Sequence, residues 1–262
     1  MITEAVPSDW KDLQQSVAQL LKECGFAVEI EKTVATVRGS VEIDVYAEEQ
    51  VRGRKYVILV ECKHWKSRVP QGVIHAFRTV VSDIGANVGY LVSMAGFQSG
   101  AFTAAELTNL RLLNWAQFQD EFERTWYETH LMPTVADRLD ALLSYTEPFL
   151  PAWFDALSET GQREYLALKD AYDRFGVLMM MFTPYSHLLN GGRDPRVPLP
   201  LRDRLGAAAD NLKHWPNAVL DSRGYKELLT ASTEFGEQIV ARFRQYRPAD
   251  VDHDDVAVPM GP

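Results

Sequence analysis

Three charged side chains on two neighbouring β-type segments could act together on a phosphate ester. In residues 41–47 apolar and polar residues alternate, which is typical of a half-buried strand, and Asp44 lies in this segment. Residues 57–63 form a second strand-like run, which ends in Glu61-Cys62-Lys63. Because side chains alternate along a strand, Glu61 and Lys63 share one face, and pairing of the two segments would bring Asp44 to them.

Such a group has a defined chemical use. Mg²⁺ binds one or two carboxylates together with waters and phosphate oxygens, and the backbone carbonyl of Cys62 is a further candidate ligand. Lys63 could position or activate a water and offset charge on a transferring phosphoryl group. Taken alone, the triplet fits better with a cross-strand salt bridge on an exposed strand edge. The strand that carries Asp44, at the right distance, favours a metal-dependent phosphodiesterase instead.

The order of these segments resembles the PD-(D/E)xK nuclease superfamily, specifically its Mrr-type restriction endonuclease-like domain. The resemblance covers roughly residues 8–120 and rests on an ordered set of features: an amphipathic helix over residues 10–24, Glu42-Ile43-Asp44-Val45, Val60-Glu61-Cys62-Lys63, a helix that opens in residues 69–77, a strand in residues 85–93 and Gly96-Phe97 before another helix. It implies cleavage of DNA, with Asp44 and Glu61 as Mg²⁺ ligands, Mn²⁺ as a substitute ion, and Lys63 as the catalytic lysine.

Two positions depart from the pattern of this family. Its members often carry a metal-assisting glutamate in the first helix, where this chain has Gln14. A neutral amide coordinates only through its carbonyl oxygen and supplies no charge, so we expect weaker metal binding or the loss of a second metal. His75 stands where a glutamine is common. It is a candidate auxiliary contact to phosphate or water, although a helix-surface histidine without such a role is the favoured interpretation.

Charge is distributed unevenly along the chain. Residues 1–119 carry 12 Lys or Arg against 13 Asp or Glu, a net charge of −1, whereas the remaining residues carry −8. DNA binding draws its affinity from neutralised phosphates, so we expect DNA at the first part of the chain. The candidate contacts are Lys66, Arg68 and Arg78. Trp65 is either a DNA-facing aromatic residue or a shield for the sheet edge.

Helices and strands must hold these residues in place. A first helix is expected to begin at the N-cap Ser8 and end at Gly25, with Trp10 on its apolar face. The other expected elements are strands at 26–30 and 34–37, a helix at 70–84, a buried strand at 88–93, a helix at 101–109 and a short strand at 112–113. The strand–helix–strand order after Lys63 implies parallel pairing, so the sheet should be mixed.

The expected fold class is α/β, with a restriction-endonuclease-like mixed sheet flanked by helices in residues 1–120. An all-α domain should follow in residues 121–246, and residues 247–262 are expected to form a disordered tail. The expected helices of the second domain are 118–127, 135–145, 162–182, 201–213 and 225–246. The run Met179-Met180-Met181 favours packing against a partner helix or subunit, with a simple helical core as an equal alternative. We therefore expect this domain to serve oligomerisation or docking of a partner protein.

The compartment is constrained by what the sequence lacks. Two cysteines are too few for a disulfide framework or a zinc site. Apolar runs fall far short of the roughly 20 residues that a membrane helix needs, and no signal-peptide pattern is visible. We expect a cytoplasmic protein without a membrane partner.

These features predict a Mg²⁺-dependent DNA endonuclease. As the resemblance implies, it would serve restriction or anti-phage defence, and assembly or a partner protein would gate it, because such a nuclease must be restrained in its host. Two alternatives stay open: a structure-selective DNA repair nuclease, and a catalytically silent nuclease-fold subunit with a regulatory or binding role. Gln14 favours the silent subunit, whereas Asp44, Glu61 and Lys63 together argue against it.

Overall fold

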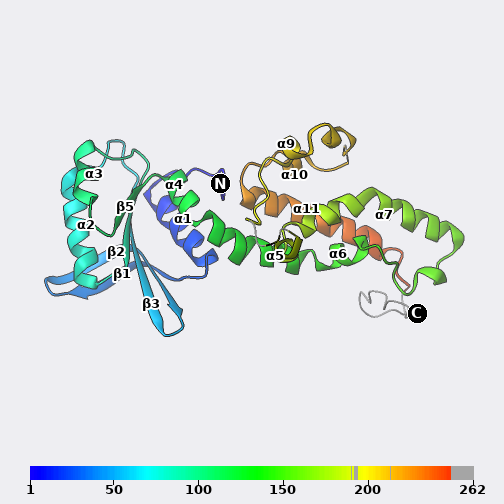
Figure 1. The fold of residues 1–262 in the computed structure, drawn as a ribbon, viewed down its shortest axis with the longest axis horizontal. Coiled ribbons are helices and arrows are strands. Elements are labelled where there is room, and N and C mark those ends of the chain that lie inside the picture. Colours follow the sequence, from blue (N-terminus) through cyan, green and yellow to red (C-terminus); the bar gives the residue numbers. More distant parts are fainter. Residues whose placement is uncertain (190, 192–193, 213, 249–262) are drawn as a thin grey trace. The chain divides into compact units, whose positions relative to one another are not determined.

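The computed structural model describes residues 1–189, 191, 194–212 and 214–248, and the chain divides into two compact units (Figure 1). Residues Met1–Thr129, the sheet unit, contain every strand of a five-stranded sheet. The described part of residues His130–Pro262, the helical unit, contains helices joined by loops and no strand. The predicted fold class, a mixed sheet flanked by helices and followed by a helical region, is confirmed.

The strand order in the sheet follows the order in the chain, β1-β2-β3-β4-β5. Hairpins join the antiparallel strands β1 (Ala27–Thr36), β2 (Gly39–Val51) and β3 (Arg54–Lys63). The strand β4 (Val88–Ser93) pairs in parallel with β3, and β5 (Leu110–Leu113) pairs in parallel with β4. The helices α2 (Gln71–Ile84) and α3 (Ser99–Ala105) provide the two crossovers that this pairing needs. Parallel pairing after Lys63 therefore agrees with the prediction.

Helices cover both faces of the sheet (Figure 1). α1 (Trp10–Glu23) and α4 (Trp115–Trp126) pack on one face, and α2 and α3 pack on the other. The N-cap of α1 is Asp9 rather than the expected Ser8: the Asp9 carboxylate accepts the backbone N–H of Asp12 at 2.9 Å. Ser8 instead donates its hydroxyl to the Asp12 carboxylate.

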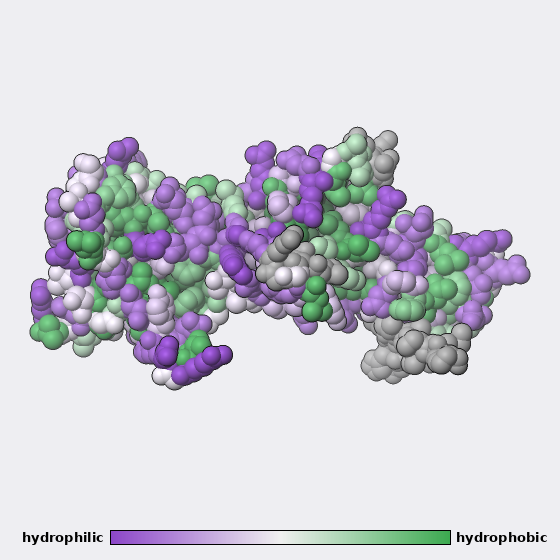
Figure 2. All heavy atoms as spheres, in the orientation of Figure 1, coloured by the Kyte–Doolittle hydropathy of each residue, from purple (hydrophilic) through white to green (hydrophobic). Residues whose placement is uncertain are grey.

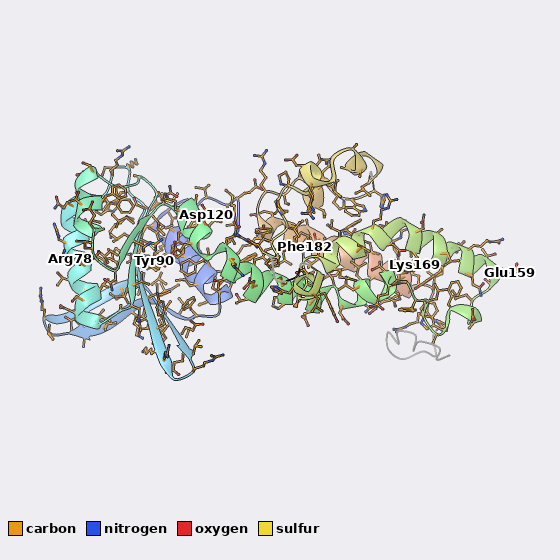
Figure 3. The ribbon with its side chains drawn as sticks, in the orientation of Figure 1. Arg78, Tyr90, Asp120, Glu159, Lys169 and Phe182 are labelled. Carbon is orange, nitrogen blue, oxygen red and sulfur yellow. The ribbon has the colours of Figure 1, made fainter. Side chains whose placement is uncertain are left out.

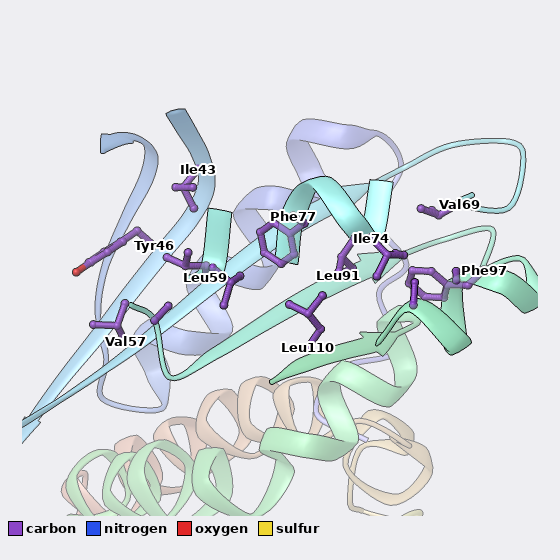
Figure 4. Packing of buried hydrophobic residues seen from close by; sticks show 14 residues of the cluster. Ile43, Tyr46, Val57, Leu59, Val69, Ile74, Phe77, Leu91, Phe97 and Leu110 are labelled. Atoms are coloured by element: carbon purple, nitrogen blue, oxygen red, sulfur yellow. The ribbon is translucent and has the colours of Figure 1, made fainter. Parts of the chain in front are cut away.

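The core on the α2 face is one cluster of buried side chains (Figure 4). Val57 and Leu59 of β3 lie in it together with Ile74 and Phe77 of α2. The close approach of α2 to the sheet needs a glycine at position 89, since a Cβ there would lie 2.5 Å from a methyl group of Val81. This packing fixes which side chains of β3 face α2.

The prediction of two short strands at 26–30 and 34–37 is wrong, because β1 is continuous. Its ladder with β2 pairs Ile30 with Val45 and resumes at Lys32 with Ile43, so the ladder steps over one residue on each strand. The residue on β1 is Glu31, whose φ of 52° lies in the left-handed region. A turn of the backbone at Glu31 thus changes the direction of the hairpin without ending the strand.

The residue on β2 at the same step is Asp44. Ile43 and Tyr46, three positions apart, would face opposite sides of a straight strand, yet both belong to the cluster under α2. The strand therefore bends between them, at Asp44.

The helical unit is built around α6 (Asp140–Thr146), α7 (Glu159–Met180) and α11 (Tyr225–Arg244). Its other described elements are η1 (Tyr127–Leu131), which begins in the sheet unit, α5 (Met132–Arg138), η2 (Phe154–Ala156), α8 (Tyr185–Leu189), α9 (Leu201–Leu205), η3 (Gly206–Asn211) and α10 (Asn217–Asp221). Two expected helices are shorter than predicted. The 135–145 segment is divided at Leu139, and the 201–213 segment is α-helical only to Leu205, with residue 213 outside the described part.

Two observations concern the ends and the surface. Residues 249–262, which make up most of the expected disordered tail, lie outside the described residues. Among the helices that are described, none is long and apolar enough to cross a membrane. Figure 2 shows hydrophilic residues spread over the visible face of both units.

Candidate active site

The structure brings the predicted residues Asp44, Glu61 and Lys63 together. Glu61 and Lys63 alternate with the buried Cys62 and lie on the α2 side of β3, as Leu59 does. The Lys63 ammonium forms an ion pair with the Glu61 carboxylate, and their side chains are only 15% and 24% exposed. Asp44 joins them from β2, where its Oδ2 accepts the backbone N–H of Cys62 at 2.7 Å.

The bend of β2 is what aims the Asp44 side chain. The β2–β3 ladder begins at Val45 with Val60, and the β1–β2 ladder steps over Asp44. At this point the backbone carbonyl of Asp44 accepts the Nε2 donor of Gln14 at 3.1 Å. Its carboxylate is left to take the N–H of Cys62, which holds it beside Glu61.

Gln14 therefore lies at the site, as its position in α1 predicts. Its side chain is buried, with 2% of the residue exposed, and its amide nitrogen is used by the Asp44 carbonyl. In this arrangement Gln14 supports the strand that carries the carboxylate.

The surroundings of Asp44 disfavour its charged form. Burial, and then the neighbouring Glu61 charge, raise the pKa of Asp44 from 3.8 to about 6, against the opposing effects of the Cys62 N–H and the Lys63 charge. Burial also raises the pKa of the Cys62 thiol well above its ordinary value. The Cys62 side chain is thus a neutral core residue, and only its backbone could serve as a ligand.

The donor set fits a hard divalent cation. Two carboxylates and a backbone carbonyl are all oxygen ligands, which Mg²⁺ and Mn²⁺ prefer. The raised pKa of Asp44 indicates that Lys63 offsets only part of the negative charge here, and a cation would offset the rest. Within the described residues, no group of three or more His, Cys, Asp or Glu side chains could hold a metal ion. Waters and substrate oxygens would have to complete the coordination, as is usual for Mg²⁺.

The remaining predicted residues lie on the segments that follow Lys63. Lys66 and Arg68 are exposed in the loop from β3 to α2. His75 is exposed on α2, with its Nε2 3.0 Å from the side-chain nitrogen of Gln71. Arg78 lies farther along α2 (Figure 3).

Trp65 and Trp10 each contact a residue of the site. The Lys63 Nζ lies 5.4 Å from the centre of the Trp65 ring, so Trp65 contacts the lysine as a cation–π partner. Trp10, which the sequence assigned to an apolar helix face, donates a side-chain hydrogen bond to Asp44. Its position four residues before Gln14, on the same face of α1, is the signal that could have revealed this role.

Comparisons with known proteins bear on residues 7–122, which match the family Mrr_cat, described as restriction endonuclease. A crystal structure of a protein of unknown function, AF1548, aligns over 88% of this chain and 95% of its own, with 15% sequence identity and a TM-score of 0.36. That agreement is too low to show a shared fold. No curated protein matches the chain.

Proposed function

We propose, because residues 7–122 match the restriction endonuclease family Mrr_cat, that this protein is a metal-dependent DNA endonuclease whose catalytic residues are Asp44, Glu61 and Lys63. The observation that carries the proposal is the meeting of these three side chains from two strands, with Asp44 bonded to the backbone of Cys62.

The residues have separate tasks in this mechanism. Asp44, Glu61 and the Cys62 carbonyl would hold Mg²⁺ or Mn²⁺. When bound, such an ion polarises a phosphate oxygen and lowers the pKa of a coordinated water. Lys63 has three N–H donors, of which one meets Glu61, so the others can orient the attacking water and a phosphoryl oxygen. The water loses one proton to solvent and its oxygen bonds to phosphorus, the bond from phosphorus to the leaving sugar oxygen breaks, and that oxygen takes up a proton from solvent.

We propose that the helical unit regulates the nuclease activity through oligomerisation or a partner protein. Large apolar side chains are exposed on it, among them Phe149, Val177, Tyr185 and Leu188. Such residues favour a homo-oligomer or the docking of a partner protein. We infer a role in restriction or anti-phage defence, with activity gated by that assembly.

A catalytically silent subunit is the second candidate, and Gln14 is the observation that favours it. Its buried amide adds no negative charge to the two carboxylates and is bonded to a backbone carbonyl. Measured metal binding separates this candidate from the nuclease.

The test is cleavage of plasmid and linear DNA by the purified chain with Mg²⁺ or Mn²⁺. Asp44→Ala and Lys63→Ala should each lower the rate by at least about a hundredfold. Exposed residues of the same charge provide matched controls, Asp120→Ala and Lys22→Ala, and should leave it unchanged. Preference for junctions or flaps over plain duplex would indicate a repair nuclease.

If the wild type does not cut, calorimetric titration with Mg²⁺ decides between the remaining candidates. Binding that disappears in Asp44→Ala supports a nuclease gated by a partner. No binding to the wild type would contradict the catalytic proposal and leave the silent subunit.

A further inference from the structure

A polar cavity of about 530 Å³ lies outside the group around Asp44. Three segments that are far apart in the sequence line it: the turn between β1 and β2 with Arg38, the second half of α2 with Arg78, and the loop from α3 to β5 with Leu107. α2 also covers the face of the sheet on which Glu61 lies. The cavity therefore lies on the α2 face of the sheet unit, near the residues where β3 and β4 begin, and the candidate active site lies where β3 ends.

Two arginines and one carboxylate, that of Asp83, line the cavity. Arg38 Nε lies 3.5 Å from the Asp83 carboxylate, and the Arg38 side chain is 69% exposed, so most of its guanidinium donors face solvent. Arg78 is exposed and has no carboxylate partner among the described residues. Thr79 and Ser82 line the same wall, where the Thr79 hydroxyl donates to the backbone carbonyl of His75. A pair of guanidinium groups is a donor set that suits a phosphate.

The strand β2 runs from this cavity to the candidate active site. The same strand, β2, begins at the turn that carries Arg38 and then delivers Asp44 six residues later. Six residues of strand span at most about 20 Å, which corresponds to about six nucleotides along one strand of a duplex. DNA with its scissile phosphate at Asp44 would thus have a flanking phosphate within reach of Arg38 and Arg78.

Leu107 is an exposed apolar residue that lines the cavity. Its backbone φ of 57° lies in the left-handed region, which is costly for leucine, and its side chain is fully exposed. Leucine at this position therefore adds backbone strain and no buried apolar surface to the fold. An apolar side chain beside a phosphate site can contact the deoxyribose or the base edge of bound DNA.

We propose that this cavity binds a backbone phosphate of DNA that flanks the cleavage site, with Arg78 and Arg38 as its ligands and Leu107 as an apolar contact to the neighbouring sugar. The inference rests on the proposed function, because it takes DNA as the ligand. Asp83, which holds part of the Arg38 guanidinium, limits the affinity of the cavity.

The experiment is fluorescence anisotropy of a labelled duplex of about 20 base pairs with the full chain in EDTA, over a series of salt concentrations. Arg78→Ala should weaken binding about three- to tenfold and lower the slope of log K against log salt by about one. Asp83→Asn should tighten binding, because it releases Arg38. Leu107→Gly should weaken binding without changing the slope, since it removes no charge.

The matched control is Arg111→Ala, which removes one positive charge from the same unit. Arg111 pairs with Glu121 of α4, on the opposite face of the sheet, and should leave DNA affinity within about twofold. Thermal unfolding of each variant checks that the fold is kept. Inorganic phosphate alone, followed by calorimetry, is expected to bind far more weakly than the duplex.

Each contrary outcome has a definite meaning. If the wild type binds DNA and Arg78→Ala behaves like Arg111→Ala, the cavity is not a phosphate site and the proposed nuclease function is unaffected. If inorganic phosphate binds as tightly as the duplex, the cavity is a binding site for a free anion rather than for DNA. If the wild type binds no DNA even at low salt, the DNA substrate itself is contradicted.

Discussion

At the scale of single residues, Asp44 is partly buried, and its proposed role as a metal ligand requires a negative charge. Its pKa is raised in the folded protein from 3.8 to about 6, first by burial and then by Glu61. Between these two pH values the folded protein holds a proton that the unfolded chain has lost. Stability contributed by this group is therefore complete below about pH 4 and is lost as the pH rises through about 6.

We predict that Asp44→Asn, measured in EDTA, is more stable than the wild type at pH 8. The amide removes the buried charge and still offers an oxygen to the Cys62 N–H. The gain should be about 1–2 kcal/mol, allowing for partial solvent exposure, or about 4–8 °C in Tm. It should vanish near pH 4, where Asp44 of the wild type is protonated.

Thermal unfolding followed by circular dichroism at both pH values checks this prediction. Asp83→Asn is the control, because Asp83 already pairs with Arg38 and its neutralisation should give no gain. An Asp44→Asn protein that melts below the wild type at pH 8 would show that the carboxylate is not under electrostatic strain.

The sequence was informative about the candidate catalytic residues and much less about the contacts that hold them in place. Spacing along two strands places Asp44, Glu61 and Lys63 on one face, since alternation is a local property of the backbone. The hydrogen bond from Trp10 and the bond from Gln14 depend on how α1 approaches β2. That approach is set by tertiary packing, which local spacing does not contain.

At the scale of elements, the hairpin of β1 and β2 shows where local patterns mislead. The polar run around Glu31 interrupts alternation, so the sequence favours two strands, whereas pairing with β2 carries one strand through the interruption. Glutamate is not a residue type that favours positive φ, so nothing in the sequence marks the turn at Glu31. The division of a helix at Leu139 is similar. At this division the Leu139 side chain packs closely against Gly236 of α11, where a Cβ would lie 2.5 Å from it.

We predict that the conformation of Glu31 matters for the position of Asp44. Glu31→Gly should stabilise the protein by up to about 1 kcal/mol, because glycine adopts positive φ without strain. Glu31→Val should destabilise it by about 1–3 kcal/mol and weaken Mg²⁺ binding, because a β-branched residue resists this backbone and straightens the hairpin. Denaturant unfolding and Mg²⁺ calorimetry measure both effects.

Glu42→Val supplies the comparison for this prediction. Glu42 is exposed on β2 and pairs regularly with Thr33, so its replacement removes the same charge without touching the bend. Equal losses of Mg²⁺ affinity in the two valine variants would assign the effect to charge rather than to the hairpin.

At the scale of the whole molecule, the sequence placed a boundary near residue 120, where strand patterns end. The compact sheet unit continues to Thr129 because Phe118 and Phe122 of α4 pack on Tyr90 of the sheet, with ring centres 5.6 Å apart in each case. Helical periodicity looks the same on either side of such a boundary. It shows that α4 has an apolar face but not which unit receives that face.

The boundary predicts how shortened chains behave. Residues 1–129 should fold alone and bind Mg²⁺, because they contain the complete sheet and both helix layers. Residues 1–120 would lack Phe122 and the fully buried Trp126, whose indole N–H donates to Glu23 of α1. Deleting large buried aromatic side chains costs about 3–5 kcal/mol each, so this shorter chain should lack a cooperative unfolding transition. Circular dichroism melts with and without Mg²⁺ distinguish the two. Equal melting temperatures of the two chains would place the end of the unit before the second half of α4. A folded 1–129 chain that binds no Mg²⁺ would contradict the proposed metal site and leave the boundary unaffected.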